Sequence, residues 1–155
     1  MINLKRILIA TDFSSPAKIA MKYGVTLAKT FDAEVILCHV VEAAHIISQL
    51  SPTRESYFPP NLPELQAHEA KGLCQELLEE FGIDQTGRYL LPQGRPFFEI
   101  IQTARKEDVD LIVMGTHGRG AVAHMLLGSV AEKVVRKSPC PVLTVREGEH
   151  EFVLP

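Results

Sequence analysis

Short apolar runs alternate along the chain with longer segments in which apolar residues recur every three or four positions. Continuously apolar runs are typical of strands buried on both faces of a parallel sheet, and the longer spacing is typical of helices. The runs predict five strands, over residues 5–11, 34–41, 88–92, 109–114 and 141–145. Helical spacing predicts a helix that opens at Ser15 and Pro16, and others over residues 62–81, 96–106 and 130–137. This rhythm indicates an α/β fold with a doubly wound parallel sheet and helices on both faces.

Residue types at the ends of the predicted helices mark where each begins or stops. We expect Ser15 to be the N-cap of the first helix, with Pro16 at its first helical position. Gly82 is suited to end the second helix in the C′ position. Ser129-Val-Ala-Glu132 has the spacing of a capping box, which predicts that Ser129 caps the last helix.

Between the second strand and the second helix the pattern breaks. Five Pro and Ser residues fall between Ser51 and Pro60, so we expect a long, flexible loop over about residues 44–63, with a short helical turn near residues 44–49. Tyr57 and Phe58 in this loop would either fold over a ligand, contact a partner, or pack against the loop itself.

The composition narrows the class of protein. The 155 residues form one domain by length, 46% are hydrophobic, and the net charge is −3. A small negative net charge does not favour binding to nucleic acid. No stretch reaches the roughly 20 consecutive apolar residues that a transmembrane helix needs. The first residues lack the pattern of a signal peptide, so we expect a cytoplasmic protein. The spacing of Cys38, Cys74 and Cys140 fits no metal site. We expect Cys38 and Cys140 to be small buried hydrophobes.

The candidate chemistry lies where the fourth strand meets the last helix. Gly115 ends the strand, Gly118 follows in the loop, and Gly128 and Ser129 stand where the helix begins. Glycines let backbone amides approach an anion, and the start of a helix attracts negative charge. The pattern therefore predicts a phosphate-binding loop. The alternative is a set of ordinary turn glycines with a capping serine.

Residue types around these glycines resemble the universal stress protein family. The resemblance rests on Met-Gly-Thr-His-Gly-Arg-Gly, Leu-Leu-Gly-Ser-Val-Ala-Glu-Lys-Val and Ser-Pro-Cys-Pro-Val-Leu-Thr-Val within residues 110–146. Ile-Leu-Ile-Ala-Thr-Asp-Phe-Ser at residues 7–14 and the strand at residues 33–41 also fit the family. The family implies a strand order of 3-2-1-4-5, with a crevice between the first and fourth strands.

The resemblance implies that this crevice binds an adenine nucleotide, ATP or else AMP or ADP. Asp12 would bind ribose hydroxyls or the adenine amine, although it could instead cap the following helix, and Val40 would contact adenine through its main chain. Ala10 replaces the proline that some nucleotide-binding members carry. The expected nucleotide-binding residues are Ala10, Thr11, Asp12, Val40, Met114, Gly115, Gly118, Arg119, Gly128, Ser129 and Val130. Mg²⁺ or Mn²⁺ would arrive with the phosphates.

Two functions remain open from the sequence, beside a third possibility, ranked last, that the protein binds no nucleotide. One is a binding module that holds the nucleotide and responds to stress, as a homodimer through the fifth strand, residues 141–145. The other is a slow ATP hydrolase or phosphotransferase, in which His117 would be the general base. A P-loop pattern and a dinucleotide-binding GxGxxG are both absent from the sequence. The remaining histidines, including His39, show no ligand spacing, and we read them as surface or core residues.

Overall fold

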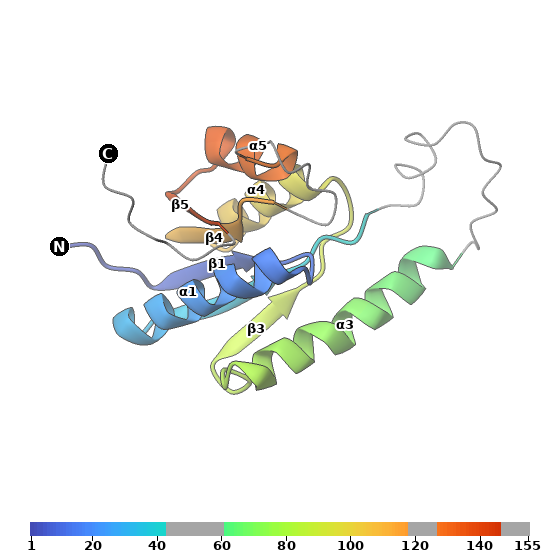
Figure 1. Ribbon diagram of the computed structural model, residues 1–155, viewed down its shortest axis with the longest axis horizontal. Coiled ribbons are helices and arrows are strands. Elements are labelled where there is room, and N and C mark those ends of the chain that lie inside the picture. Colours follow the sequence, from blue (N-terminus) through green and yellow to red (C-terminus); the bar gives the residue numbers. More distant parts are fainter. Residues whose placement is uncertain (43–60, 118–126, 147–155) are drawn as a thin grey trace.

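The computed structural model describes residues 1–42, 61–117 and 127–146 (Figure 1). In chain order they form β1 (Arg6–Ala10), α1 (Ser15–Phe31), β2 (Glu34–Cys38), α3 (Leu62–Glu80), β3 (Gly87–Leu90), α4 (Pro96–Lys106), β4 (Leu111–Gly115), α5 (Ser129–Lys137) and β5 (Val142–Val145). The strands pair in parallel in the order β3-β2-β1-β4-β5. The expected α/β fold and strand order are therefore confirmed. Most of the loop expected at residues 44–63, with Tyr57 and Phe58, lies outside the described residues.

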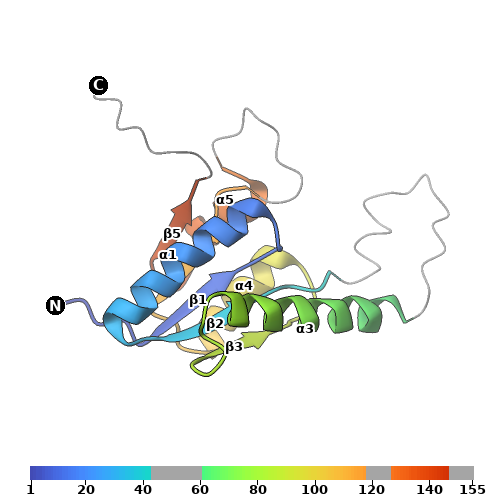
Figure 2. The same ribbon diagram turned by 60° about the horizontal axis from the view of Figure 1, so that its bottom comes forward.

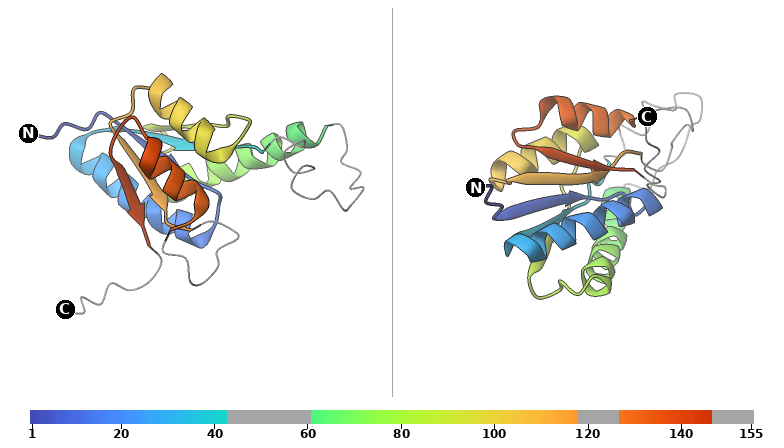
Figure 3. Two further views of the ribbon diagram at one scale, coloured as in Figure 1. Left: turned by 90° about the horizontal axis from the view of Figure 1, so that it is seen from above. Right: turned by 60° about the vertical axis from the view of Figure 1, so that its left-hand side comes forward.

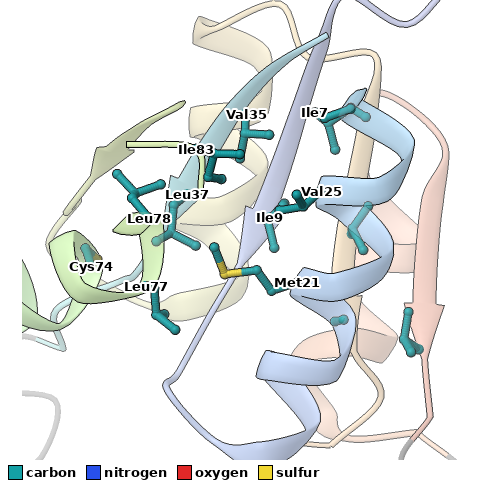
Figure 4. Packing of buried hydrophobic residues seen from close by; sticks show 14 residues of the cluster. Ile7, Ile9, Met21, Val25, Val35, Leu37, Cys74, Leu77, Leu78 and Ile83 are labelled. Atoms are coloured by element: carbon teal, nitrogen blue, oxygen red, sulfur yellow. The ribbon is translucent and has the colours of Figure 1, made fainter. Parts of the chain in front are cut away.

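Helices cover both faces of the sheet, and the strands alternate side chains between them. Helices α1 and α3 lie on one face, and α4 and α5 on the other (Figure 3). On the first face Ile7 and Ile9 of β1 pack with Met21 of α1 and Leu77 of α3 (Figure 4). Leu8 belongs to the second cluster, beneath α4 and α5. Both faces of β1 are thus buried, as its continuously apolar sequence predicts.

Two of the predicted helix starts are wrong by one residue. Ser14, in extended conformation, is the N-cap of α1, and its side chain accepts a hydrogen bond from the Ala17 amide. Gly128 is the N-cap of α5, so Ser129 is the first helical residue, and no side-chain hydrogen bond caps the helix. The capping box expected from Ser129 and Glu132 does not form. In each pair of neighbouring candidates the earlier residue takes the extended backbone that a cap requires.

Other predicted bounds of helices and strands agree more closely with the structure. Helix α4 has the predicted bounds, and Gly82 follows α3 with a positive φ of 62°, as the C′ position requires. Strand β2 ends at Cys38, three residues earlier than expected. The chain stays beside β3 after that point, because the His39 amide donates to Leu90 and the Val41 amide donates to Pro92.

Charged groups join the elements at the amino-terminal edge of the sheet. The Arg88 guanidinium donates to Glu34 at 2.6 Å and to Glu107 at 2.7 Å. The Asp110 carboxylate accepts the amides of Lys5 and Arg6 at 2.7 and 2.9 Å. These backbone hydrogen bonds lower the pKa of Asp110 below its usual value. Ion pairs and charged hydrogen bonds thus stabilise the amino-terminal edge of the sheet, whereas the carboxyl edge contains a cavity.

Candidate functional site: a cavity at the carboxyl edge of the sheet

A cavity of about 650 Å³ opens at the carboxyl ends of β1, β2 and β4. The chain crosses from β1 towards β2 and from β4 towards β5, so the connections diverge here, as they do where ligands bind in open α/β sheets. Segments far apart in the sequence share the wall. They are residues 10–13, 38–42, 114–117 and 128–131, joined by Ala17, Gln66, Glu69, Ala70, Leu73, Pro96 and Ile100.

Most of the residues predicted from the sequence lie in this wall. The nine of them that line the cavity are Ala10, Thr11, Asp12, Val40, Met114, Gly115, Gly128, Ser129 and Val130. The other two, Gly118 and Arg119, lie outside the described residues. The structure thus brings the described part of the predicted set together. The role of these residues in holding a nucleotide stays a prediction.

Helix α5 points the start of its backbone at the cavity. The amides in the first turn of a helix have no acceptor within the helix. Gly128 donates its own amide to the Thr116 carbonyl at 2.7 Å, and the helix accepts no side-chain cap. Ser129, Val130 and Ala131 follow in the cavity wall. Their amides and the helix dipole make this the part of the cavity best suited to an anion.

Helices α1 and α4, which also begin at this edge, offer less to an anion. The first turn of α1 is capped, because the Ser14 side chain accepts the Ala17 amide. Helix α4 also has no side-chain cap, but it begins with Pro96, which has no N–H to donate. In the described residues the cavity wall carries no lysine or arginine. Positive potential there therefore comes from backbone amides, chiefly those of α5.

Gly115 and Gly128 are also needed for packing. A β-carbon on Gly115 would lie 3.1 Å from the carbonyl carbon and 3.2 Å from the carbonyl oxygen of Pro16. A β-carbon on Gly128 would lie 3.0 Å from the Thr116 oxygen. Both distances are shorter than an ordinary contact of about 3.5–4.0 Å. The glycines therefore let the first turns of α1 and α5 sit close to the end of β4, which the sequence pattern alone did not reveal.

Asp12 takes part in the turn between β1 and α1. Its Oδ1 accepts the Ser14 amide at 3.0 Å and also contacts the Ser14 hydroxyl. Phe13, the next residue, has a positive φ of 64°, and its amide donates to the Thr11 hydroxyl oxygen at 3.0 Å. Asp12 is therefore a turn residue at the end of β1, but the cap of α1 is Ser14, so the alternative in which Asp12 caps the helix is wrong. The same residue also lines the cavity.

His39 belongs to the cavity wall, which its sequence context did not indicate. Its Nδ1 lies 2.9 Å from the Thr11 carbonyl, which can only accept, so Nδ1 carries the proton. The ring packs against Phe13 at 4.4 Å between centroids. His39 thereby joins the end of β2 to the end of β1. A single histidine after an apolar run has no pattern that predicts this position.

His117 lies at the other side, after β4. Its Nδ1 is 2.9 Å from the Thr116 hydroxyl, and it lines the cavity. Thr116 itself is buried and donates its amide to Val145 at 2.9 Å. The hydroxyl can thus orient the imidazole.

Two of the three cysteines, Cys38 and Cys74, are unreactive because they are buried. Burial raises the pKa of Cys38 and of Cys74 to about 12, so both thiols stay protonated at neutral pH. Cys38 is buried as predicted, whereas Cys140 is only partly buried, and desolvation raises its pKa as well. Cys74 faces the core between α3 and the sheet (Figure 4).

This fold and cavity define a class of α/β proteins that bind ligands where the strand order reverses. The sequence model of the universal stress protein family matches residues 3–146, and the chain belongs to that family. Universal stress protein MJ0531 of Methanocaldococcus jannaschii is 36% identical over 147 residues, which are 95% of this chain and 85% of that protein. Among the described residues, none of the helices has both the length and the apolar character that a membrane span needs.

Solved structures agree with this assignment. That of protein MJ0577, also from M. jannaschii, superposes with a TM-score of 0.80 at 34% identity and covers 96% of this chain and 99% of its own. A universal stress protein of Archaeoglobus fulgidus in complex with dAMP has a TM-score of 0.63 at 20% identity, over 94% of this chain and 99% of that one. At 20% identity, the similarity to the A. fulgidus protein shows a shared fold alone.

Proposed function

We propose that this protein binds ATP, or the related AMP or ADP, in the cavity and acts as a stress-response switch in the cytoplasm. The observation that carries the proposal is the first turn of α5, whose amides line the cavity without a side-chain cap. The A. fulgidus protein of the same fold was solved with an adenine nucleotide, which supports this chemistry. A switch follows if the nucleotide binds one state of the protein more tightly than another.

We infer a direction for the nucleotide in the cavity. Phosphates would lie against the amides of Ser129 and Val130, where the helix dipole favours negative charge. The adenosine would then lie towards the end of β2, where Val40 offers its main chain and Asp12 a carboxylate. Mg²⁺ or Mn²⁺ would be carried by the phosphates, whose oxygens are the ligands that these cations prefer.

We also propose a homodimer through β5, which is an edge of the sheet. The Ile112 amide donates to Pro141, and the Thr116 amide donates to Val145. Backbone groups alternate along a strand, so those of Thr144 face away from β4. An edge of this kind pairs readily with a second strand.

The first experiment identifies what the protein carries. Heating the purified protein releases any bound small molecule, which mass spectrometry then identifies. Recovery of AMP, ADP or ATP supports the proposal. Protein that carries no adenylate and also gives no calorimetric heat with added ATP contradicts it.

A slow hydrolase is the second candidate, favoured by one contact. The Thr116 hydroxyl orients the His117 ring in the wall, as a general base requires. Incubation with ATP and Mg²⁺ separates the two functions. Turnover that His117→Ala abolishes, with ATP affinity retained, favours the hydrolase, and retained ATP without product favours the switch.

A further inference from the structure

The turn between β1 and α1 brings Asp12 into the cavity wall on an unfavourable backbone conformation. Phe13, the residue after Asp12, has a φ of 64°. Among the described residues, the other non-glycine residues with a positive φ are Asp32 and Asp108, and aspartate adopts this conformation far more readily than a bulky aromatic residue. A residue in such a conformation stays there only where its surroundings hold it. The turn that carries Asp12 therefore needs support from outside itself.

His39 supports this turn from the segment that follows β2. Strands β1 and β2 are parallel neighbours, so the chain leaves both of them at the same edge of the sheet (Figure 2). The His39 Nδ1 donates to the Thr11 carbonyl oxygen at 2.9 Å, and the imidazole packs against the Phe13 ring at 4.4 Å between centroids. His39 thus contacts the residue before Asp12 and the residue after it.

The hydrogen bond from His39 fixes the peptide group that leads into Asp12. The Thr11 carbonyl belongs to the planar peptide bond between Thr11 and Asp12. The Thr11 amide donates to the Cys38 carbonyl at 2.9 Å, so the consecutive residues Cys38 and His39 bind both backbone groups of Thr11. Within the turn, the Ser14 amide donates to Asp12 Oδ1 at 3.0 Å. The place of the Asp12 carboxylate therefore depends on contacts with the end of β2 as well as on the turn.

We propose that His39 is a positioning residue that holds the Asp12 carboxylate where it accepts hydrogen bonds from the sugar hydroxyls of the nucleotide. This rests on the proposed function, and it adds that affinity for the sugar depends on a residue outside the turn. A carboxylate has about four acceptor sites, so a carboxylate anchored by Ser14 can also bind a ligand. Without His39 only a fraction of the molecules keeps Asp12 in place, and the apparent affinity falls by that fraction.

The test compares His39→Asn with His39→Leu, two variants of similar shape. The asparagine amide can take the place of Nδ1 and donate to Thr11, whereas leucine has no donor. Calorimetry measures the affinity of the wild-type protein and of each variant for ATP and for dideoxy-ATP, an analogue that lacks both hydroxyls of the sugar ring. One neutral hydrogen bond is worth about a three- to tenfold change in affinity. We expect the preference for ATP over dideoxy-ATP to be lower in His39→Leu than in His39→Asn by that factor. A general loosening of the fold would weaken the binding of both nucleotides alike and would leave the preference unchanged.

His68→Leu is the matched control, because His68 is exposed on α3 and lies outside the cavity wall. This variant keeps the wild-type preference. If His39→Leu does not fold, His39→Phe takes its place, since phenylalanine keeps a ring against Phe13 and has no donor.

Two results would refute the role of His39 while nucleotide binding stands. One is an equal preference for ATP in the asparagine and leucine variants. The other is wild-type protein that binds ATP and dideoxy-ATP equally, because Asp12 then does not bind the sugar. If wild-type protein binds neither nucleotide, the proposed function fails, and the role of His39 fails with it.

Discussion

Replacing Gly115 by alanine separates two reasons for a glycine at the end of β4. The sequence pattern places it there so that an anion can approach the backbone. The structure adds that a β-carbon would lie 3.1–3.3 Å from atoms of Pro16 in the first turn of α1. The φ of Gly115 is not positive, so backbone strain is not involved. Only the packing reason predicts a loss of stability without nucleotide.

The expected magnitude follows from these contacts. Relief of the overlap requires the backbone around Pro16 to move by a few tenths of an ångström, and overpacking of this kind costs about 1–3 kcal/mol. Alanine recovers roughly 0.5–1 kcal/mol, because it has less freedom than glycine in the unfolded chain. We therefore expect the free energy of unfolding to fall by about 0.5–2 kcal/mol.

The assay is urea unfolding of the nucleotide-free protein, with Gly72→Ala as the control. Gly72 lies within α3, and a β-carbon there would meet no atom within 4 Å. Alanine at this helical position should raise the free energy of unfolding by about 0.5–1 kcal/mol. If Gly115→Ala proves as stable as the wild type, or more so, then contact with α1 does not require the glycine, and the reasoning is refuted.

Two further predictions concern the rest of the sheet. The pKa of Asp110 is lowered by hydrogen bonds from the amides of Lys5 and Arg6, so its contribution is present above the unfolded pKa and is lost as pH falls through the folded pKa. Asp110→Asn should therefore cost about 1 kcal/mol at pH 7, and denaturation at pH 3 should show a smaller difference from the wild type. Equal differences at both pH values would count against this. Thr144→Pro removes an outward amide at the β5 edge, and should give monomers in sedimentation where Thr144→Val stays dimeric. An unchanged dimer would place the interface elsewhere.

The architecture follows from the sequence because its main signals are local. Continuous apolar runs mark the strands, and Pro96 and Gly82 mark helix ends within a few residues of themselves. The predicted N-caps of α1 and α5 are one residue too late, because in each case two neighbouring residues suit an N-cap. Sequence cannot choose between Gly128 and Ser129, since the choice depends on the Gly128 amide reaching the Thr116 carbonyl.

The site was predicted in part for a similar reason. Residue type and spacing identify the glycines and the carboxylate at the end of the first strand. Of these, Gly115, Gly128 and Asp12 lie in the described residues and line the cavity. The place of Gln66 and Glu69 in the cavity wall could not be predicted, because an amphipathic pattern shows which residues share a helix face but not what that face covers. The position of His39 depends on the pairing of β2 with β1, and the contact of Gly115 with Pro16 depends on the packing of α1 against β4. Both lie beyond local patterns.

The central claim is that the first-turn amides of α5 hold the phosphates, and Ser129 allows one amide to be removed alone. Proline is favoured at the first helical position, and the extended backbone of Gly128 accepts a proline after it. Ser129→Pro therefore deletes the N–H and the hydroxyl, whereas Ser129→Ala deletes the hydroxyl alone.

The measurement is the calorimetric affinity of ATP for these two variants. Hydrogen bonds to charged groups are worth about 1.5–3 kcal/mol, so Ser129→Pro should bind ATP about 10- to 100-fold more weakly than Ser129→Ala. Equal affinities in two folded variants would contradict the claim that this helix start binds the phosphates.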